Sequence, residues 1–331
     1  MRKIFSNFVK TYFSRFYKFW RKKNLSLIFY LIKKDILLCF LNKKILQTRS
    51  FTLDPAADVE VHSLISSRDL GVYLLAIKSL LRFSCGFKVV VHDDGSLTER
   101  DKDVLRQHVQ GIKIIDRSFA DKVILQKYSG QEASLFLREQ TPNFMQVMDY
   151  FVLSESKKVI GMDSDVLFFQ YPQALMDWVN GHEEVILYNF QSGVGLNSLK
   201  ESDFTGAPFK VSETGINCGF FCAYKGLEDP DLLEKFLKLG KEVPGFSSDI
   251  FPNYAILAQN AFSVLVLNSR WPAKPLPEMD YKVLCNAIFL QDPALFAKDS
   301  VFKHYAAFEH RFLERFQYVR DLKRIISGLT D

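Results

Sequence analysis

Asp163 and Asp165 are the two residues of this chain whose type and spacing point most directly to chemistry. They follow the predicted strand Lys157–Met162 and precede an apolar run, Val166–Phe169. If the strand continued through them, side chains at positions i and i+2 would lie on the same side. Two carboxylates held that close need a cation or a proton between them. Oxygen ligands favour Mg²⁺ or Mn²⁺, so this acidic pair predicts a divalent metal site.

Polar residues also follow two predicted strands in the first half of the chain. The carboxyl ends of parallel strands meet at one edge of a sheet, where ligands bind. Backbone N–H groups at a helix start beside an arginine suit a phosphate, and carboxylates suit hydroxyls of a ribose or the edge of a base. A purely structural interpretation is also open, in which Ser67 caps a helix and Asp94-Gly95 forms a turn. The predicted nucleotide-binding residues are Ser66, Ser67, Arg68, Asp93 and Asp94.

The spacing of apolar residues predicts the elements that position these groups. Strands and helices alternate, which favours an α/β fold with a parallel sheet and right-handed crossovers. The glycine loops GxGxxG and GxxxxGK[ST] are missing from the sequence, which argues against dinucleotide dehydrogenases and P-loop enzymes. The predicted strands are Val59–Ile65, Phe87–Val91, Ile112–Ile115 and Lys157–Met162, and the predicted helices are Leu70–Phe83, Thr98–Val109 and 143–154.

Charge divides the chain into two parts. Residues 1–50 hold thirteen Lys or Arg and one acid, which leaves thirty basic and thirty-seven acidic groups in the rest. Five aromatic residues between Ile4 and Trp20 recur at helical spacing opposite basic residues, as in helices that lie at a membrane interface. The apolar runs that follow, 25–32 and 36–41, are shorter than the roughly 20 residues needed to span a bilayer.

We therefore predict a basic helical arm over residues 1–50 and a linker over 51–58. Residues 1–49 are expected to bind an anionic membrane surface, which predicts a peripheral protein on the cytoplasmic face. An alternative is that the arm packs on the body as an ordinary helix. Nucleic acid is not an expected partner, because the body is acidic and no recognition motif accompanies the arm. Five cysteines, an odd number, agree with a reducing compartment.

Three later segments, taken in order with the acidic pair, resemble the glycosyltransferases of the GT-A fold, and loosely the retaining enzymes of glycosyltransferase family 8. Ile216–Phe221 resembles the Asn-x-Gly turn and strand that follow the DxD motif in that family. The segment 248–257 stands at the place of an acidic segment and helix beside the transferred sugar, and 302–305 resembles a late histidine-aromatic element. The similarity runs from about residue 59 to about residue 310.

This resemblance implies a Rossmann-like, mostly parallel sheet flanked by helices over residues 59–331. Within it, 59–165 would be the nucleotide-binding half, 166–310 the acceptor and sugar half, and 311–331 a C-terminal helix. It implies an enzyme of hexosyltransferase type, retaining, that moves a sugar from a nucleotide-diphospho-sugar to a glycan or lipid-linked acceptor with Mn²⁺ or Mg²⁺. The implied metal ligands are Asp163, Asp165 and His304, the implied catalytic residues are Asn217 and Asp249, and the implied donor-binding residues include Asp163, Ser164, Asn217 and Gly219.

The sequence also departs from the family pattern. The Gly and Lys-Pro-Trp expected after the histidine are replaced by residues 306–311, and Asp249 is followed by Ile250. Two other functions stay open at this point. One is a non-catalytic, membrane-tethered binding protein on a degenerate transferase fold. The other is a phosphohydrolase of the haloacid dehalogenase type, in which a strand also ends in two aspartates.

Overall fold

The computed structural model describes residues 43–191, 201–211, 215–243, 251–276, 302–304 and 312–330. Met1–Thr48 and Arg49–Asp331 are two separate compact units. The aromatic stripe predicted between Ile4 and Trp20 lies outside the described residues, so the arm stays a prediction. None of the helices in the described ranges has both the length and the apolar character required to cross a bilayer.

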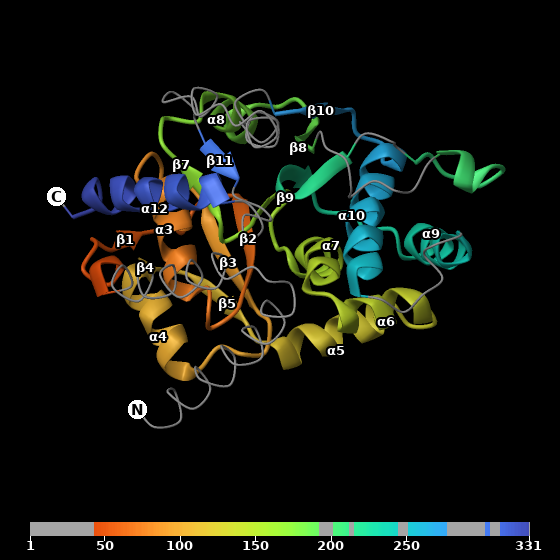
Figure 1. Cartoon of the computed structure of the whole chain (residues 1–331), viewed down its shortest axis with the longest axis horizontal. Coiled ribbons are helices and arrows are strands. Elements are labelled where there is room, and N and C mark those ends of the chain that lie inside the picture. Colours follow the sequence, from red (N-terminus) through yellow and green to blue (C-terminus); the bar gives the residue numbers. More distant parts are fainter. Residues whose placement is uncertain are drawn as a thin grey trace. The chain divides into compact units, whose positions relative to one another are not determined.

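A central sheet with the order β10-β8-β9-β6-β2-β3-β5 organises the larger unit (Figure 1). Neighbouring strands β6, β2, β3 and β5 pair in parallel. Strand β9 pairs antiparallel with β6 and with β8, and β10 is parallel to β8. The predicted α/β class with a mostly parallel sheet is therefore confirmed. The strands are β2 (Val59–Ile65), β3 (Lys88–Asp93), β5 (Lys113–Ile115), β6 (Lys158–Met162), β8 (Ile186–Gln191), β9 (Gly215–Tyr224) and β10 (Ala273–Pro275).

Helices flank this sheet, and those predicted from apolar spacing begin and end within about two residues of the expected positions. Thr98 caps one of them in a capping box, because its Oγ1 accepts from the backbone N of Asp101 at 3.2 Å while Asp101 accepts from the backbone N of Thr98. The helices are α3 (Leu70–Leu81), α4 (Glu99–His108), α5 (Arg117–Lys127), α6 (Glu132–Gln140), α7 (Pro142–Leu153), α8 (Gln173–Asn180), α9 (Pro230–Glu242), α10 (Phe251–Asn268) and α12 (Phe312–Ser327).

Two short pairings lie outside the central sheet. Strand β1 (Phe51–Thr52) pairs in parallel with β4 (Val109–Gln110), so the segment expected to be a linker begins with a strand. Phe51 and Leu53 are buried, and this burial ties the segment to the body. Strand β11 (Phe302–His304) pairs antiparallel with β7 (Val166–Phe168), which brings a late segment beside the residues that follow the acidic pair.

The core on one face of the sheet contains a cluster of aromatic rings. Phe221 of β9 lies 4.5 Å from Phe262 of α10 and 5.6 Å from Phe151 of α7, measured between ring centroids. Its partner across the strands is Gly161 of β6, and a Cβ atom at Gly161 would lie 2.2 Å from Cε1 of Phe221. The glycine therefore leaves the space that the Phe221 ring occupies, two residues before the acidic pair.

Candidate functional site

The acidic pair lies in the tight turn between β6 and β7. Asp163 follows β6 directly, and its carbonyl oxygen accepts from the backbone N of Val166 at 3.3 Å, where β7 begins. The two carboxylates therefore do not stand at i and i+2 of a regular strand, which corrects that part of the prediction. The acidic pair does follow the carboxyl end of a parallel strand, as the sequence predicts, since β6 pairs in parallel with β2.

A neutral donor holds the first carboxylate of the pair. The Nε2 amide of Gln146, on α7, donates to Oδ1 of Asp163 at 2.7 Å, and Gln146 is buried. Hydrogen bonds to an ionised acceptor are stronger than those between neutral groups, and this one stabilises the carboxylate without adding a charge. Sequence reasoning missed Gln146. The signal was a single amide within the otherwise apolar run from Phe144 to Met148.

The Asn-x-Gly segment, which was predicted to form a turn, adjoins the acidic pair through the backbone. The carbonyl of Gly219 accepts from the backbone N of Asp163 at 2.8 Å, next to the pairing of Met162 with Phe220. Asn217 and Gly219 lie inside β9 and not in a turn before it, which corrects that part of the prediction, and the pairing of β9 with β8 shifts register beside them. The side-chain Oδ1 of Asn217 accepts from the backbone N of Gly219 at 2.7 Å within this irregularity. The two segments that the family resemblance links are thus hydrogen-bonded neighbours.

His304 comes to the same end of β6 through its strand. In the antiparallel pairing of β11 with β7, His304 lies opposite Val166, the residue after Asp165. Directly opposed residues in such a pair have Cα atoms about 4.5–5.5 Å apart. Among the described residues, no three His, Cys, Asp or Glu side chains form a group that could hold a metal ion. The metal role of His304 stays a prediction, and Asp249 lies outside the described residues.

The predicted nucleotide-binding loops lie side by side at this edge. Ile65 at the end of β2 pairs with Asp93 at the end of β3, and its carbonyl accepts from the backbone N of Asp94 at 3.2 Å. Helix α3 begins at Leu70 with Asp69 in the flanking position, so Ser67 does not cap it. The Ser67 hydroxyl instead donates to Asp101 Oδ2 at 2.8 Å, and the next residue, Arg68, is 75% exposed at its side chain.

Asp93, the last residue of β3, and Asp94 after it both accept hydrogen bonds from the following loop. Oδ1 of Asp93 accepts from the backbone N of Gly95 at 2.7 Å and of Leu97 at 3.0 Å, and Asp94 accepts from the backbone N of Ser96 at 2.9 Å. Gly95 has φ +97°, a conformation that glycine adopts readily, so the predicted Asp-Gly turn is confirmed. Contact of Asp93 and Asp94 with a nucleotide stays a prediction.

A buried polar chain, which sequence reasoning missed, runs along the sheet toward this edge. We name Glu60, His62 and His92 the carboxylate–histidine chain. Glu60 Oε2 lies 3.0 Å from Nε2 of His62, whose Nδ1 lies 2.8 Å from Nε2 of His92. The ring of Tyr150 packs on both imidazoles. Polar residues at alternate positions of a predicted strand were the available signal for Glu60 and His62.

Burial and hydrogen bonding determine which groups of the carboxylate–histidine chain are charged. Burial lowers the pKa of His62, which the neighbouring Glu60 only partly offsets, and burial lowers the pKa of His92 well below 6.5. The pKa of Glu60 falls to about 2, because hydrogen bonds from His62 and Ser154 outweigh the effect of its burial. The Nε2–H of a neutral His62 donates a hydrogen bond to an ionised Glu60, and Nδ1 of His62 accepts one from the Nε2–H of His92.

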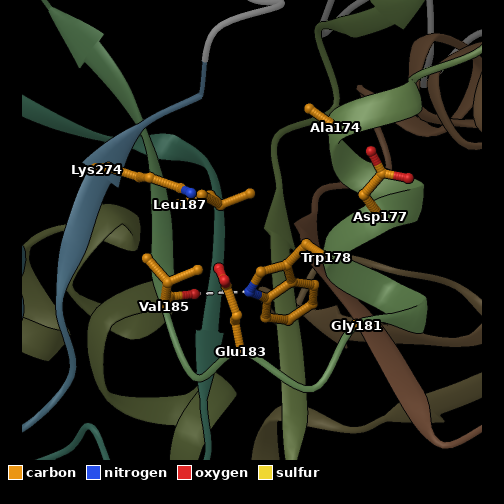
Figure 2. Close-up of a pocket in the computed structure, with 8 residues that line it drawn as sticks. All are labelled: Ala174, Asp177, Trp178, Gly181, Glu183, Val185, Leu187 and Lys274. Carbon is orange, nitrogen blue, oxygen red and sulfur yellow. Dashed lines mark hydrogen bonds between the residues drawn. The ribbon is translucent and has the colours of Figure 1, made fainter.

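A hollow of about 330 Å³ lies elsewhere, beside α8, β8 and β10 (Figure 2). The indole Nε1 of Trp178 donates to the carbonyl of Val185 at 2.7 Å on its wall. Val185 precedes β8, whereas the acidic pair follows β6, and the two strands run the same way. The hollow is therefore at the opposite edge of the sheet, and none of the predicted site residues lines it. Its lining residues are Ala174, Asp177, Trp178, Gly181, Glu183, Val185, Leu187 and Lys274.

Solved structures resemble this chain in fold, although their sequence identity to it is low. No protein-family model matches the sequence, and no curated protein matches it. The chain is similar to solved structures of glycosyltransferases. One is the galactosyltransferase LgtC in complex with donor and acceptor sugar analogues, with 14% identity over 82% of this chain and 97% of that chain and a TM-score of 0.48.

Two further solved structures are of the same kind. Mouse xyloside xylosyltransferase 1 is 13% identical over 76% of this chain and 99% of its own, with a TM-score of 0.45. The glycosyltransferase GlyE of Streptococcus pneumoniae TIGR4 is 13% identical over 82% of this chain and 63% of its own, with a TM-score of 0.43.

Proposed function

We propose that this protein is a glycosyltransferase that moves a sugar from a nucleotide-diphospho-sugar to an acceptor with the help of a divalent metal ion. One observation carries the proposal. The acidic pair, the Asn217–Gly219 segment of β9 and the strand that ends at His304 are far apart in the sequence but adjoin at the carboxyl end of β6. The hydrogen bond from Asp163 N to Gly219 O and the register of β11 on β7 support it.

The chemistry of the donor set suits Mn²⁺ or Mg²⁺. Carboxylate oxygens are the ligands that these hard ions prefer, and an imidazole is compatible with Mn²⁺. Asp163, Asp165 and His304 would hold the ion, with Gln146 fixing one oxygen of Asp163. When bound, such an ion offsets the negative charge that develops on a departing nucleoside diphosphate.

Other residues of this chain would bind and orient the substrates. Arg68 and the backbone at Ser66 and Ser67 would contact phosphate, and Asp93 and Asp94 would contact the nucleoside, as their position at neighbouring strand ends supports. In the proposed hexosyl transfer with retention, Asn217 and Asp249 would position the sugar. The acceptor is a glycan or a lipid-linked glycan, and the basic arm would hold the enzyme on the cytoplasmic face of a membrane.

A panel of nucleotide-sugars with Mn²⁺ or Mg²⁺ tests this function on the full chain. Release of nucleoside diphosphate and transfer to glycan acceptors are measured for the wild type, Asp165→Asn and a control, Asp103→Asn. Asp103 is an exposed acid paired with Arg106 on α4. We expect Asp165→Asn to lose about 100-fold or more in rate, because a Lewis acid contributes several kcal/mol, and the control to match the wild type.

Three results would contradict the proposal in different ways. Unchanged turnover in Asp165→Asn would remove the metal assignment. Turnover of phosphate esters in place of nucleotide-sugars would identify a phosphohydrolase. Stabilisation of the fold by a nucleotide-sugar without any turnover would identify a binding protein, because a ligand that binds only the folded state raises its stability.

A further inference from the structure

Three arginines from separate segments of the unit Arg49–Asp331 lie close together. Arg49 precedes β1, Arg82 follows α3, and Arg324 lies in the last turn of α12, which packs on α3 (Figure 1). The backbone N of Arg49 donates to the carbonyl of Leu329 at 3.0 Å. A Cβ atom on Gly328 would lie 3.4 Å from Nη1 of Arg82. These contacts bring the start of β1, the end of α3 and the end of α12 together.

Each guanidinium of this arginine cluster lies over an aromatic ring. The Cζ atoms lie 4.9 Å from the Phe51 centroid for Arg49, 4.6 Å from the Phe83 centroid for Arg82, and 5.4 Å from the Phe169 centroid for Arg324. Stacking restricts a guanidinium and leaves the N–H groups on its edge available to an anion. Arg82 also donates through Nη2 to the carbonyl of Phe168 at 2.9 Å, which fixes its orientation.

The cluster has no carboxylate partner in the described part of the chain. None of the ion pairs between described residues includes Arg49, Arg82 or Arg324. The Nε of Arg82 is buried and lacks a hydrogen-bond partner among those residues. Burial lowers the pKa of Arg82, and the charges of Arg324 and Arg49 lower it further. Mutual repulsion of this kind is relieved when an anion binds.

We propose that Arg49, Arg82 and Arg324 form a binding site for a phosphate group. A phosphate carries several acceptor oxygens and up to two charges, which suits three converging guanidinium groups. Tyr171 is 47% exposed and packs edge-on against Phe83, so an aromatic rim adjoins the cluster. The phosphate belongs either to an anionic lipid headgroup or to a soluble phosphorylated molecule, and both present the same chemistry to the cluster.

The site is distinct from the proposed sugar-transfer site. Helix α3 starts near the carboxyl end of β2 and returns the chain toward the start of β3, so Arg82 lies away from the edge that holds the acidic pair. Phosphate binding at the arginine cluster therefore does not depend on glycosyl transfer, and either proposal can fail alone.

The test compares the full chain with two double variants of equal charge change. Arg49→Glu with Arg324→Glu removes two members of the cluster. Arg106→Glu with Arg270→Glu is the matched control, because Arg270 is also exposed and stacks on a ring, that of Trp271, at 4.5 Å. Thermal unfolding is followed with inorganic phosphate against chloride at equal ionic strength. Cosedimentation is measured with phosphatidylcholine vesicles with and without phosphatidic acid.

We expect phosphate to raise the unfolding temperature of the wild type and the control but not of the cluster variant. A lipid source predicts that the cluster variant also loses binding to acidic vesicles, by about fivefold for each arginine, while the control changes less. A soluble source predicts loss of the phosphate effect with vesicle binding equal to that of the control. Phosphate stabilisation of the cluster variant equal to that of the control would overturn the proposal.

A milder variant keeps the test decisive if the charge reversal prevents folding. Arg49→Lys with Arg324→Lys preserves the net charge but loses the planar donor edge, so phosphate affinity should fall about tenfold or more while folding is retained. Unchanged phosphate affinity in that variant would equally overturn the proposal. Nucleotide-sugar turnover, measured in parallel, should stay at the wild-type rate in both cluster variants.

Discussion

Gly161→Ala tests whether position 161 of β6, the strand that leads into the acidic pair, has room for a side chain. The new Cβ would lie 2.2 Å from Cε1 and 2.3 Å from Cζ of Phe221. Ordinary carbon contacts are about 3.5–4.0 Å, so the ring or the strand must move by more than about 1 Å. The ring is fully buried between Phe151 and Phe262, and strand pairing of β6 with β9 holds the backbone.

Overpacking of this kind typically costs about 1–3 kcal/mol. For a unit of this size each kcal/mol lowers the unfolding temperature by about 2–4 °C, so we expect a decrease of roughly 2–12 °C. The assays are thermal unfolding and urea unfolding followed by fluorescence, with the unfolding temperature, the urea midpoint and the slope measured for each variant. Gly86→Ala is the control, because its Cβ would meet its nearest neighbour, Ser84 Oγ, at 3.4 Å, and it should change stability by less than about 0.5 kcal/mol.

A double variant identifies the Phe221 ring as the cause. Phe221→Leu removes Cε1 and Cζ, the two ring atoms that the new Cβ would approach most closely, and by itself costs part of the roughly 3–5 kcal/mol of a full Phe→Ala truncation. In that background Gly161→Ala should cost at least about 1 kcal/mol less than in the wild type. An equal cost of Gly161→Ala in both backgrounds, or an unchanged midpoint in the single variant, would refute this explanation.

Three further predictions concern buried polar groups. Arg138→Met should destabilise the fold by about 3–5 kcal/mol, because it leaves the buried Asp149, now bound at 2.7 and 2.8 Å, unpaired, and adding Asp149→Leu should restore most of the urea midpoint. Gln146→Leu should weaken Mn²⁺ binding in calorimetry by up to about 10- to 100-fold, since it removes a hydrogen bond to a charged acceptor, and an unchanged affinity, equal to that of the control Gln173→Leu on α8, would contradict this. Stability should decrease as pH falls below about 6.5, by up to about 1.4 kcal/mol per pH unit for each histidine of the carboxylate–histidine chain, because only the unfolded imidazoles take up protons there. His108 adds a similar contribution, because burial and the charge of Lys78 lower its pKa to about 4. His92→Gln should therefore reduce the slope of the urea midpoint between pH 7 and 5 by about one third, and a slope that does not change would be inconsistent with a neutral buried pair.

Local sequence signals were sufficient for the elements that alternate along the chain. The strand Val59–Ile65 was predicted at its observed bounds, because four aliphatic residues, three of them buried, occupy seven positions before a polar segment. The helix before β6 was predicted to one residue, since apolar residues cover most of its surface. These elements depend on residues that are close in the sequence, so the periodicity of apolar residues predicts them.

Features that depend on pairing between distant segments could not be predicted in the same way. Nothing in the residues around β9 indicates that it inserts antiparallel between β6 and β8, since strand order is set by tertiary packing. The hydrogen bond from Gln146 to Asp163 joins a helix to a turn, and the arginine cluster joins three segments. The spacing of residues along the chain does not report contacts between distant segments. The family resemblance named the acidic pair and the Asn217 segment in chain order, and their shared role in a site stays a prediction.

The pairing of β11 with β7 has a consequence for the order in which a nascent chain is completed. The sheet and the acidic pair require nothing beyond residue 276 among the described elements, whereas the strand that brings His304 to β7 lies from Phe302 onward. During synthesis the sheet can therefore form before the rim of the proposed site is finished. A chain terminated before residue 302 would lack this side of the site, and it would also lack α12, whose buried Leu322 and Ile325 belong to the core beside α3. The end of the chain therefore completes both the rim of the proposed site and the packing of α3.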